Sequence, residues 1–466
     1  MSICSSGLDA PCRVQPVTIE VSPTHPLIQL AQVIPWPALA ELVLPDLQQT
    51  TAKGKWWLGR KLKLRIQLGA FLLQWLYNLT DRQVEWAIRD NAAYQLFCGW
   101  GSVAPWHAPD HTKIEEFRSR LSPETQRTLA NEVAVWATEL GFADPSAMDI
   151  DSTVQEANIA YPSDAQLMVK MTLLVNKVWT YMKQNISFFA DFIPRVDVKA
   201  VKAKARTYFF RDRKDPDQAK TAFQELWHEA FTQISHVRKY FAVLLDYDLQ
   251  RMPWNIRRAV DQAHEHCSQF FLSVAGFMYR GVVDREKPLS FHAKAVRCFN
   301  KGKLSGGLQF GRAFQLGRVG GNFLLVGACT SLRMEDKASV RPMITAHQHL
   351  FGERTLQSFG TDKGYYSAAN RKYLQALPSL EEFCLQQPGL DTGSVLESDA
   401  AAYARLADRR AGIEPLIGHA KQGGQLGKSR MKQDETTLAA GYASIGGFNL
   451  RQLIRHLLGK DIKAMA

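Results

Sequence analysis

The sequence predicts a mixed α and β protein in which long helical segments surround a few strands. Helical periodicity and helix-start signals dominate residues 53–141, 165–289 and 401–456. Alternating or continuous apolar runs bounded by turn residues, which are typical of strands, occur at 148–159 and 306–328. A chain of 466 residues is long enough for two or three domains. We therefore expect a helical N-terminal domain, a sheet, and a helical segment that separates the first strand from the later ones.

The composition is that of a globular protein with an excess of positive charge. Apolar residues make up 46% of the chain and charged residues 22%. Lys and Arg number 57 and Asp and Glu 45, so the formal net charge is +12. This excess favours a polyanionic partner such as nucleic acid. An ordinary basic protein without such a partner stays open from charge alone.

The cysteines and the apolar segments indicate a reducing, aqueous location. The seven cysteines are scattered and include no CxxC pair, which argues against a zinc site and against a disulfide framework. The first residues lack the basic and apolar regions of a signal peptide, and the most apolar window, 68–79, is too short to span a bilayer. We expect a soluble, cytoplasmic protein.

The N-terminal helices begin at recognisable capping residues. Residues 1–52 contain several prolines and are expected to be poorly ordered. Thr80 with Gln83, and Thr112 with Glu115, each fit a capping box. Short helices with basic ends can dock on DNA as helix-turn-helix modules do. A plain helical bundle is the alternative.

The helical segment that follows the first strand contains a basic stretch. Residues 195–215 hold eight Lys and Arg against three Asp, and the cations Lys202, Lys204 and Arg206 are followed by three consecutive aromatic residues. Cations next to aromatic rings suit the neutralisation of phosphates and the stacking of bases. A solvated helix face explains the same pattern without DNA.

Three acidic residues at the ends of predicted elements are candidates for a metal site. Asp151 is expected to end the first strand, Asp362 to end a further possible strand at 354–361, and Glu414 to lie near the start of a helix, where Pro415 is tolerated. Carboxylates from such positions can meet at one edge of a sheet and hold Mg²⁺. Ordinary turn or cap residues, and the helix macrodipole at Glu414, are the alternatives.

Several motifs in order resemble the DDE transposases of bacterial insertion sequences of the insertion-sequence-five type. The segments "DIDSTVQEANIAYPSD" and "TDKGYYS" resemble the first two acidic motifs and select Asp151 and Asp362. In "RRAGIEPLIGHAK", Arg410, Glu414 and Lys421 fit a family pattern of Tyr, Arg, Glu and Lys, and Ala407 stands at the Tyr position. The stretches "LQWLYNLTDRQVEWAIRDNAAYQLFCGW" and "APDHTKIEEFRSRL" resemble the family's N-terminal domain, and "GYASIGGFNLRQLIRHLL" resembles its closing helix.

This resemblance implies an RNase H-like fold, a mixed β-sheet flanked by helices with the acids at one edge. The implied division is a poorly ordered segment at 1–52, a helical DNA-binding domain at 53–142, a catalytic domain at 143–164 and 290–460, and a helical insertion at 165–289. Asp149 and Asp151 share one face of the strand because side chains alternate. The motif selects Asp151, so Asp149 is expected to be an outer or solvent-facing acid.

The resemblance also implies a function, namely transposition of a mobile genetic element. Asp151, Asp362 and Glu414 would hold Mg²⁺ or Mn²⁺, in a site for two ions. The reaction would be cleavage at the transposon ends and transfer of the freed 3′-OH to target DNA. If one helix runs from Arg410 to Lys421, both cations share a face with Glu414 and reach DNA phosphate, with intrahelical pairing to Glu414 as the alternative.

The partners that the resemblance implies are double-stranded DNA at the terminal inverted repeats and at the target, with a homo-oligomer on DNA in the bacterial nucleoid and no membrane. Two other classes stay open. One is a nuclease of the same fold that cuts without joining. The other is a non-catalytic DNA-binding relative, which the departure at Ala407 keeps open.

Overall fold

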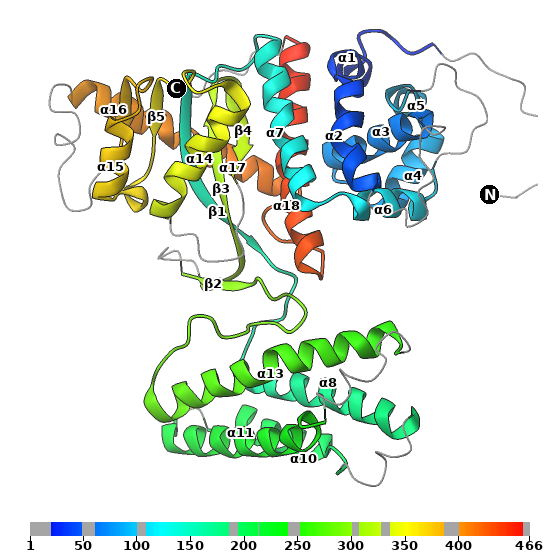
Figure 1. Cartoon of the computed structure of the whole chain (residues 1–466), viewed down its shortest axis with the longest axis vertical. Coiled ribbons are helices and arrows are strands. Elements are labelled where there is room, and N and C mark those ends of the chain that lie inside the picture. The colour runs from blue at the N-terminus through cyan, green and yellow to red at the C-terminus, as the bar shows by residue number, and fades with distance from the viewer. Residues whose placement is uncertain are drawn as a thin grey trace, which may run out of the picture.

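The computed structural model has the mixed α and β architecture that the sequence predicts, with an open mixed sheet (Figure 1). It describes residues 20–48, 61–99, 109–185, 194–212, 214–240, 252–300, 307–327, 336–385 and 400–459.

Seven helices precede the first strand in the described residues. They are α1 (Pro26–Val33), α2 (Trp36–Gln48), α3 (Lys61–Tyr77), α4 (Asp81–Asp90), α5 (Ala92–Phe97), α6 (His111–Arg120) and α7 (Pro123–Glu139). The expectation that residues 1–52 are poorly ordered is wrong for α1 and α2, because their apolar faces are buried through Leu27, Val43 and other side chains. Residues 1–19 and 49–52 lie outside the described residues.

No single described helix is long and apolar enough to span a bilayer, although α1 and Trp36–Leu47, bent by 72°, meet the length and composition criteria as a pair.

The two predicted capping boxes have different outcomes. Thr80 caps α4, and both of its reciprocal hydrogen bonds with Gln83 are present. The capping box at Thr112 is wrong, because Asp110 is the N-cap of α6 and accepts a hydrogen bond from the Lys113 amide at 2.9 Å. Thr112 instead donates its hydroxyl hydrogen to Asp110. Asp and Thr are both favoured at the N-cap, and here Asp110, two positions before Thr112, takes that position.

Within the described residues, six strands form one sheet. They are β1 (Ala147–Glu156), β2 (Arg297–Phe299), β3 (Gln309–Val319), β4 (Phe323–Val326), β5 (Ser358–Gly360) and β6 (Glu382–Cys384), in the order β2-β3-β1-β5-β6 with β4 also paired to β3. β1 and β3 are antiparallel over nine residue pairs, from Met148–Val319 to Glu156–Gly311. β5 and β6 run parallel to β1. β5 ends opposite Asp149, so the later residues of β1, from Ile150 onward, extend past the carboxyl end of β5.

The turn between β3 and β4 forms where the sequence predicts it. Gly321 and Asn322 both have positive φ, at 76° and 64°, a conformation that Gly and Asn tolerate better than other residues. A side chain on Gly321 would also place its Cβ 2.0 Å from the carbonyl oxygen of Phe142. The position thus requires glycine for two separate reasons.

Helices cover both faces of the sheet. They are α14 (Asp336–Phe351), α15 (Ala368–Gln375), α16 (Ala400–Ala411), α17 (Ile413–Gln422) and α18 (Asp434–Leu457). Met343 of α14 lies against Gly317 on one face, and on the other face Phe314 meets Tyr442 of α18 with their ring centroids 5.6 Å apart. Ser367 caps α15, as predicted, by accepting a hydrogen bond from the Asn370 amide at 3.0 Å.

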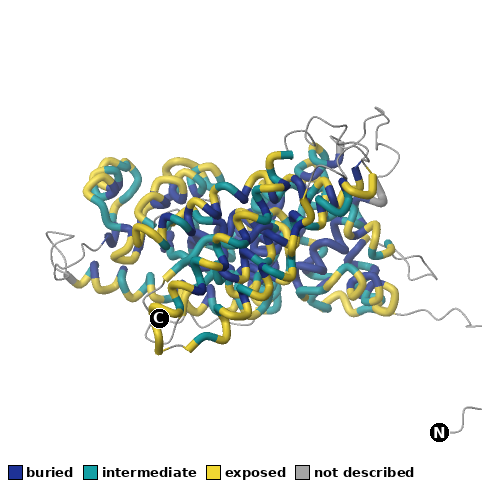
Figure 2. The backbone as a smooth tube through the Cα atoms, turned by 90° about the horizontal axis from the view of Figure 1, so that it is seen from below, coloured by how far each residue is buried: buried dark blue, intermediate teal, exposed yellow. Residues whose placement is uncertain are grey.

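The N-terminal helices and the sheet share one hydrophobic core, and α18 runs through its centre. Asn449 of α18 donates to the carbonyl oxygens of Ala130 in α7 and Leu324 in β4, and accepts from the Leu324 amide at 2.9 Å. Figure 2 shows the buried positions gathered towards the middle of the molecule. Cutting the chain after residue 142 would expose the faces of α3 and α7 that rest on α18.

A separate group of helices lies between β1 and β2 in the chain. They are α8 (Asp164–Asn185), α10 (Val198–Phe209), α11 (Pro216–Arg238) and α13 (Trp254–Arg280). They pack on one another around their own hydrophobic cluster and lie apart from the sheet (Figure 1). The exact domain boundaries, including the insertion at 165–289, stay a prediction.

Candidate active site

A buried ion pair anchors α16 to the sheet. Asp149 and Asp151 alternate with apolar residues on β1, so both face α16. The Asp149 carboxylate accepts hydrogen bonds from Nε and Nη2 of Arg409 at 3.0 and 2.8 Å, and Arg409 Nη1 donates to the Ser358 hydroxyl of β5 at 2.6 Å. The expectation of an outer or solvent-facing Asp149 is wrong, because its exposed fraction is 3%. The sequence does not reveal this, since the partner is 260 residues away.

Two glycines make room for this pair. A Cβ on Gly360 would lie 2.2 Å from Oδ1 of Asp149. A Cβ on Gly412 would lie 2.1 Å from Nη1 of Arg318, which donates to the carbonyl oxygen of Arg409 at 2.8 Å. Burial raises the pKa of Asp149, and the hydrogen bonds and charge of Arg409 oppose that rise. The geometry of two near-parallel hydrogen bonds is that of an ionised carboxylate with a guanidinium.

The expectation that Asp151 ends a strand is wrong, whereas Asp362 and Glu414 lie after a strand and at the start of a helix, as expected. Asp151 lies in the middle of β1, and Asp362 lies two residues after β5. Glu414 lies in the first turn of α17, together with Pro415. β1 and β5 are adjacent and parallel, and Asp151 and Asp362 each lie two residues beyond Asp149–Gly360, the last residue pair that joins these strands.

One guanidinium joins all three carboxylates. Arg410 Nη2 lies 3.1 Å from Oδ2 of Asp151 and 3.5 Å from Oδ2 of Asp362. Its Nη1 lies 3.3 Å from Oε1 of Glu414. The Arg410 and Asp151 side chains are 16% and 17% exposed, whereas those of Asp362 and Glu414 are at least half exposed. The structure therefore brings together three acids separated by 211 and 52 residues of sequence.

The helix that carries Arg410 does not run through to Lys421. α16 ends at Ala411 and α17 begins at Ile413, with Gly412 between them. The pairing of Arg410 with Glu414, which the sequence left as an alternative to DNA contact, forms across this break. Lys421 lies near the end of α17, and its Cβ lies 3.5 Å from the position that a Cβ on Gly427 would take.

The donor set around Arg410 suits a hard cation. Carboxylate oxygens are the ligands that Mg²⁺ and Mn²⁺ prefer, and the arginine is a positive charge that stands where the three acids converge. In the described part of the chain, no three His, Cys, Asp or Glu side chains are close enough together to hold an ion directly. The three carboxylates that contact Arg410 are therefore not placed to hold one ion directly in this structure.

Two tyrosines near the acids were not singled out from the sequence. Tyr365 is buried and donates its hydroxyl hydrogen to Oε1 of Gln315 at 2.8 Å. Burial and the charges of Asp336 and Asp151 raise the pKa of Tyr365.

Tyr403 lies one helical turn before Ala407, and its hydroxyl contacts the Cys384 thiol. Ala407 is only partly buried, and no periodicity or spacing signal marks Tyr403 as a neighbour of this site.

The basic stretch forms α10, and its three candidate cations differ in their surroundings. Lys202 and Arg206 are exposed. Lys204 Nζ pairs with the Glu225 carboxylate of α11 at 2.9 Å. Phe210, at the C-terminal end of the helix, is 84% exposed. This helix thus presents two unobstructed cations and an aromatic ring on the surface of the insertion.

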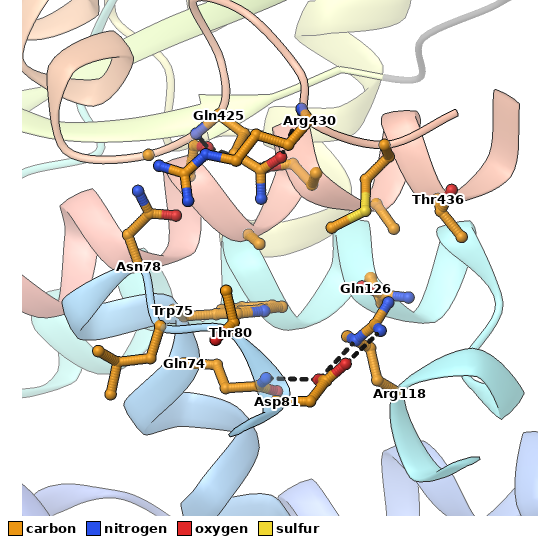
Figure 3. A pocket seen from close by; sticks show the side chains of 17 residues that line it. Gln74, Trp75, Asn78, Thr80, Asp81, Arg118, Gln126, Gln425, Arg430 and Thr436 are labelled. Carbon is orange, nitrogen blue, oxygen red and sulfur yellow. Dashed lines mark hydrogen bonds and ion pairs between the residues drawn. The ribbon is translucent and has the colours of Figure 1, made fainter. Parts of the chain in front are cut away.

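A hollow of about 250 Å³ lies between the N-terminal helices and α18 (Figure 3). On one side, Asp81 accepts hydrogen bonds from Gln74 Nε2 at 2.7 Å and from Arg118 Nη2 at 2.9 Å. On the other side, Gln425 and Arg430 come from the segment that joins α17 to α18. This segment therefore faces the N-terminal helices directly.

Residues 17–120 match a family model described as a transposase domain (DUF772). The N-terminal helices thus resemble a transposase domain. A protein of Rhizobium meliloti described as "Uncharacterized protein ORF8 in nfe locus" is 28% identical over 156 residues, which cover 32% of this chain and 70% of that protein. No solved structure matches the chain. These findings support a relation to a transposase family, and the domain match ends before Asp151.

The buried pair predicts a large loss of stability in Asp149→Asn. Removing one charge of a buried pair leaves the other uncompensated, so we expect the free energy of unfolding to fall by roughly 3 kcal/mol. Chemical denaturation followed by circular dichroism measures this change. The control is Asp408→Asn on the exposed face of α16, which should change the free energy by less than about 0.5 kcal/mol. Equal midpoints for the two variants would show that the pair does not anchor α16.

Proposed function

We propose that the protein is a DDE transposase that cuts DNA at transposon ends and joins the freed 3′-OH to target DNA. The observation that carries this proposal is the convergence of Asp151, Asp362 and Glu414 on one guanidinium. Acids that lie so far apart in the sequence are brought together by the tertiary fold, because no local interaction links them. The match of residues 17–120 to a transposase domain supports the same reading from a separate part of the chain.

The topology also supports an RNase H-like catalytic domain. The sheet is mixed, with β3 antiparallel and β5 and β6 parallel to β1. Helices cover both faces, and Asp151 and Asp362 each lie two residues beyond Asp149–Gly360, the last residue pair of β1 with β5.

In this proposal Asp151, Asp362 and Glu414 would hold two Mg²⁺ or Mn²⁺ ions. Bound ions supply an activated water and stabilise the leaving oxygen of the phosphodiester. Hydrolysis breaks the P–O3′ bond so that one product ends in a 3′-OH. In the second step that hydroxyl forms a new bond to a target phosphorus, and the target's own 3′ oxygen leaves. The protein's acids position the reacting groups, and no covalent bond to the protein forms.

The DNA is held by surfaces outside the carboxylates. We propose that the N-terminal helices recognise the transposon ends, because they match the transposase domain. Lys202 and Arg206 of α10 are proposed to contact DNA phosphates, with Lys204 contributing less because it is paired. Arg410 and Lys421 are proposed phosphate contacts near the reacting bond. Assembly as a homo-oligomer on DNA is part of the same proposal.

The triad predicts three inactive variants. Asp151→Asn, Asp362→Asn and Glu414→Gln each remove one ligand charge, so each should abolish Mg²⁺-dependent cleavage of DNA that carries the transposon ends. DNA binding and the circular dichroism spectrum should be retained. A gel assay of the full chain measures cleavage, with Asp408→Asn as the active control.

Cleavage close to that of the unsubstituted protein by any of the three would remove that residue from the site. A second assay, with pre-cut ends and a target plasmid, distinguishes a transposase from a nuclease, because only the former makes joined products. Binding to the ends without any cleavage would identify the protein as a non-catalytic DNA-binding relative. That alternative stays open because Ala407 stands where the family pattern has Tyr.

The surroundings of α10 predict the size of a salt effect. Each phosphate contact contributes about 0.9 to the slope of log affinity against log salt concentration. Alanine at Lys202, Lys204 and Arg206 should therefore lower that slope by about two rather than three, because Glu225 already neutralises Lys204. Fluorescence anisotropy at several salt concentrations measures it. An unchanged slope would mean that α10 is a solvated face.

A further inference from the structure

Arg410 is surrounded by the acids that are proposed to hold divalent ions. We infer that Arg410 is a built-in counter-ion that occupies the place of these ions in the metal-free protein and swings out when they bind. This inference rests on the proposed function, because it takes Asp151, Asp362 and Glu414 as metal ligands. It adds a switch that neither the transposase resemblance nor the domain match describes.

Electrostatics gives the reason for a resident cation. Three carboxylates that face one another repel, and the guanidinium compensates them through contacts of 3.1, 3.5 and 3.3 Å. An arginine remains protonated at all ordinary pH values, so it cannot lose its charge when a metal arrives. The two cations therefore exclude each other, and the side chain must leave.

The two neighbouring arginines, Arg409 and Arg410, differ in how many of their side-chain nitrogens are hydrogen-bonded. Arg409 is held by Asp149 and Ser358 through all three of its side-chain nitrogens. Arg410 contacts the acids through Nη1 and Nη2 only, and its buried Nε has no hydrogen-bond partner among the residues that the structure describes. It lies at the end of α16, next to the break at Gly412. The backbone is thus fixed by Arg409, and Arg410 is the side chain that loses least by moving.

The displaced guanidinium has a suitable second partner. Arginine binds phosphate oxygens through paired hydrogen bonds, and DNA phosphates would lie beside the carboxylates in the proposed reaction. Metal entry would then release an arginine for the substrate backbone. Charge at the site would stay balanced in both states.

The test is a Mn²⁺ titration of the full chain without DNA, followed by electron paramagnetic resonance of the free ion. Arg410→Gln should bind Mn²⁺ about tenfold more tightly than the unsubstituted protein, because a competing unit charge has gone. Arg410→Lys keeps the charge and should stay within about twofold. Arg405→Gln, on the exposed side of α16, is the control for loss of a cation elsewhere on this helix.

Equal or weaker Mn²⁺ binding by Arg410→Gln, alongside measurable binding by the unsubstituted protein, would overturn the counter-ion role and leave the metal site intact. Absence of Mn²⁺ binding in both proteins would overturn the proposed metal site as well. Asp151→Asn in the Arg410→Gln background should lose the gained affinity, which ties the effect to this site.

An independent observation concerns the segment between α17 and α18. Residues 421–433 contain four cations and no Asp or Glu. Lys428, Arg430 and Lys432 are exposed, and within the described residues none of them forms an ion pair. From these features we also infer that residues 423–433 form a docking surface for the backbone of duplex DNA.

The segment is held firmly in place. Glu156 donates its amide hydrogen to the Gly427 carbonyl oxygen at 2.9 Å and accepts from the Ser429 amide at 2.8 Å. Asn158 donates to the carbonyl oxygen of Arg430 at 2.9 Å. The cations thus sit on a backbone pinned to the far end of β1, between α17 and the N-terminal helices across the hollow in Figure 3. A duplex that reaches from those helices to Glu414 would pass over them.

The salt dependence of DNA binding tests this surface. Alanine at Lys428, Arg430 and Lys432 should lower the slope of log affinity against log salt concentration by two to three, at about 0.9 per lost contact. The matched control is alanine at Lys287, Lys294 and Arg405, which changes the net charge equally but removes cations that are already paired with acids and lie outside the N-terminal helices. Equal slopes for the two triple variants would overturn the surface. An unsubstituted protein that binds no DNA would overturn the proposed function as well.

Discussion

The ion pair between Asp149 and Arg409 is the constraint on which the candidate site depends. It joins β1, β5 and α16 at one point, since Arg409 also bonds to Ser358. Arg410 is the next residue, so with Arg409 fixed its side chain lies close to Asp151, in the middle of β1, and to Asp362, two residues after β5. Gly360 is part of the same arrangement, because any side chain there would collide with the Asp149 carboxylate. A single buried contact thus sets the position of an entire acidic cluster.

Local features of the fold were largely predictable from the sequence. The strand at Asp151, the Gly-Gly-Asn turn after Val319 and the caps at Thr80 and Ser367 all follow from interactions within a few residues. The three acids could be selected only through the resemblance, because nothing in periodicity joins positions 211 and 52 residues apart. Pairing of Arg410 with Glu414 was an open alternative, but its contacts with Asp151 and Asp362 were not predicted.

The failed predictions have a common physical cause. The cap at Asp110 displaced Thr112 because two suitable residues competed for one helix end. Asp149 was misplaced because its burial depends on a partner in a helix near the other end of the chain. Helices α1 and α2 were not predicted because prolines were taken as a sign of disorder. Pro26 lies at the first position of α1, where a helix tolerates proline, and Pro45 lies inside α2. Both helices are stabilised by a core to which other helices contribute. In each case a long-range or competing contact outweighed the local signal.

The route by which the chain enters and leaves its helical insertion has a consequence for evolution. The outgoing strand β1 is hydrogen-bonded to β3, with the Ala157 amide donating to the Phe310 carbonyl oxygen at 2.9 Å, and β2, the first strand on the return, pairs with the other side of β3. Ala157 also packs with Ala293 and Val296 of the returning chain. The insertion is therefore joined to the sheet by two chain segments that lie side by side, and it has its own hydrophobic core. Because loop closure entropy rises slowly with length, such a pendant unit tolerates replacement, shortening or duplication.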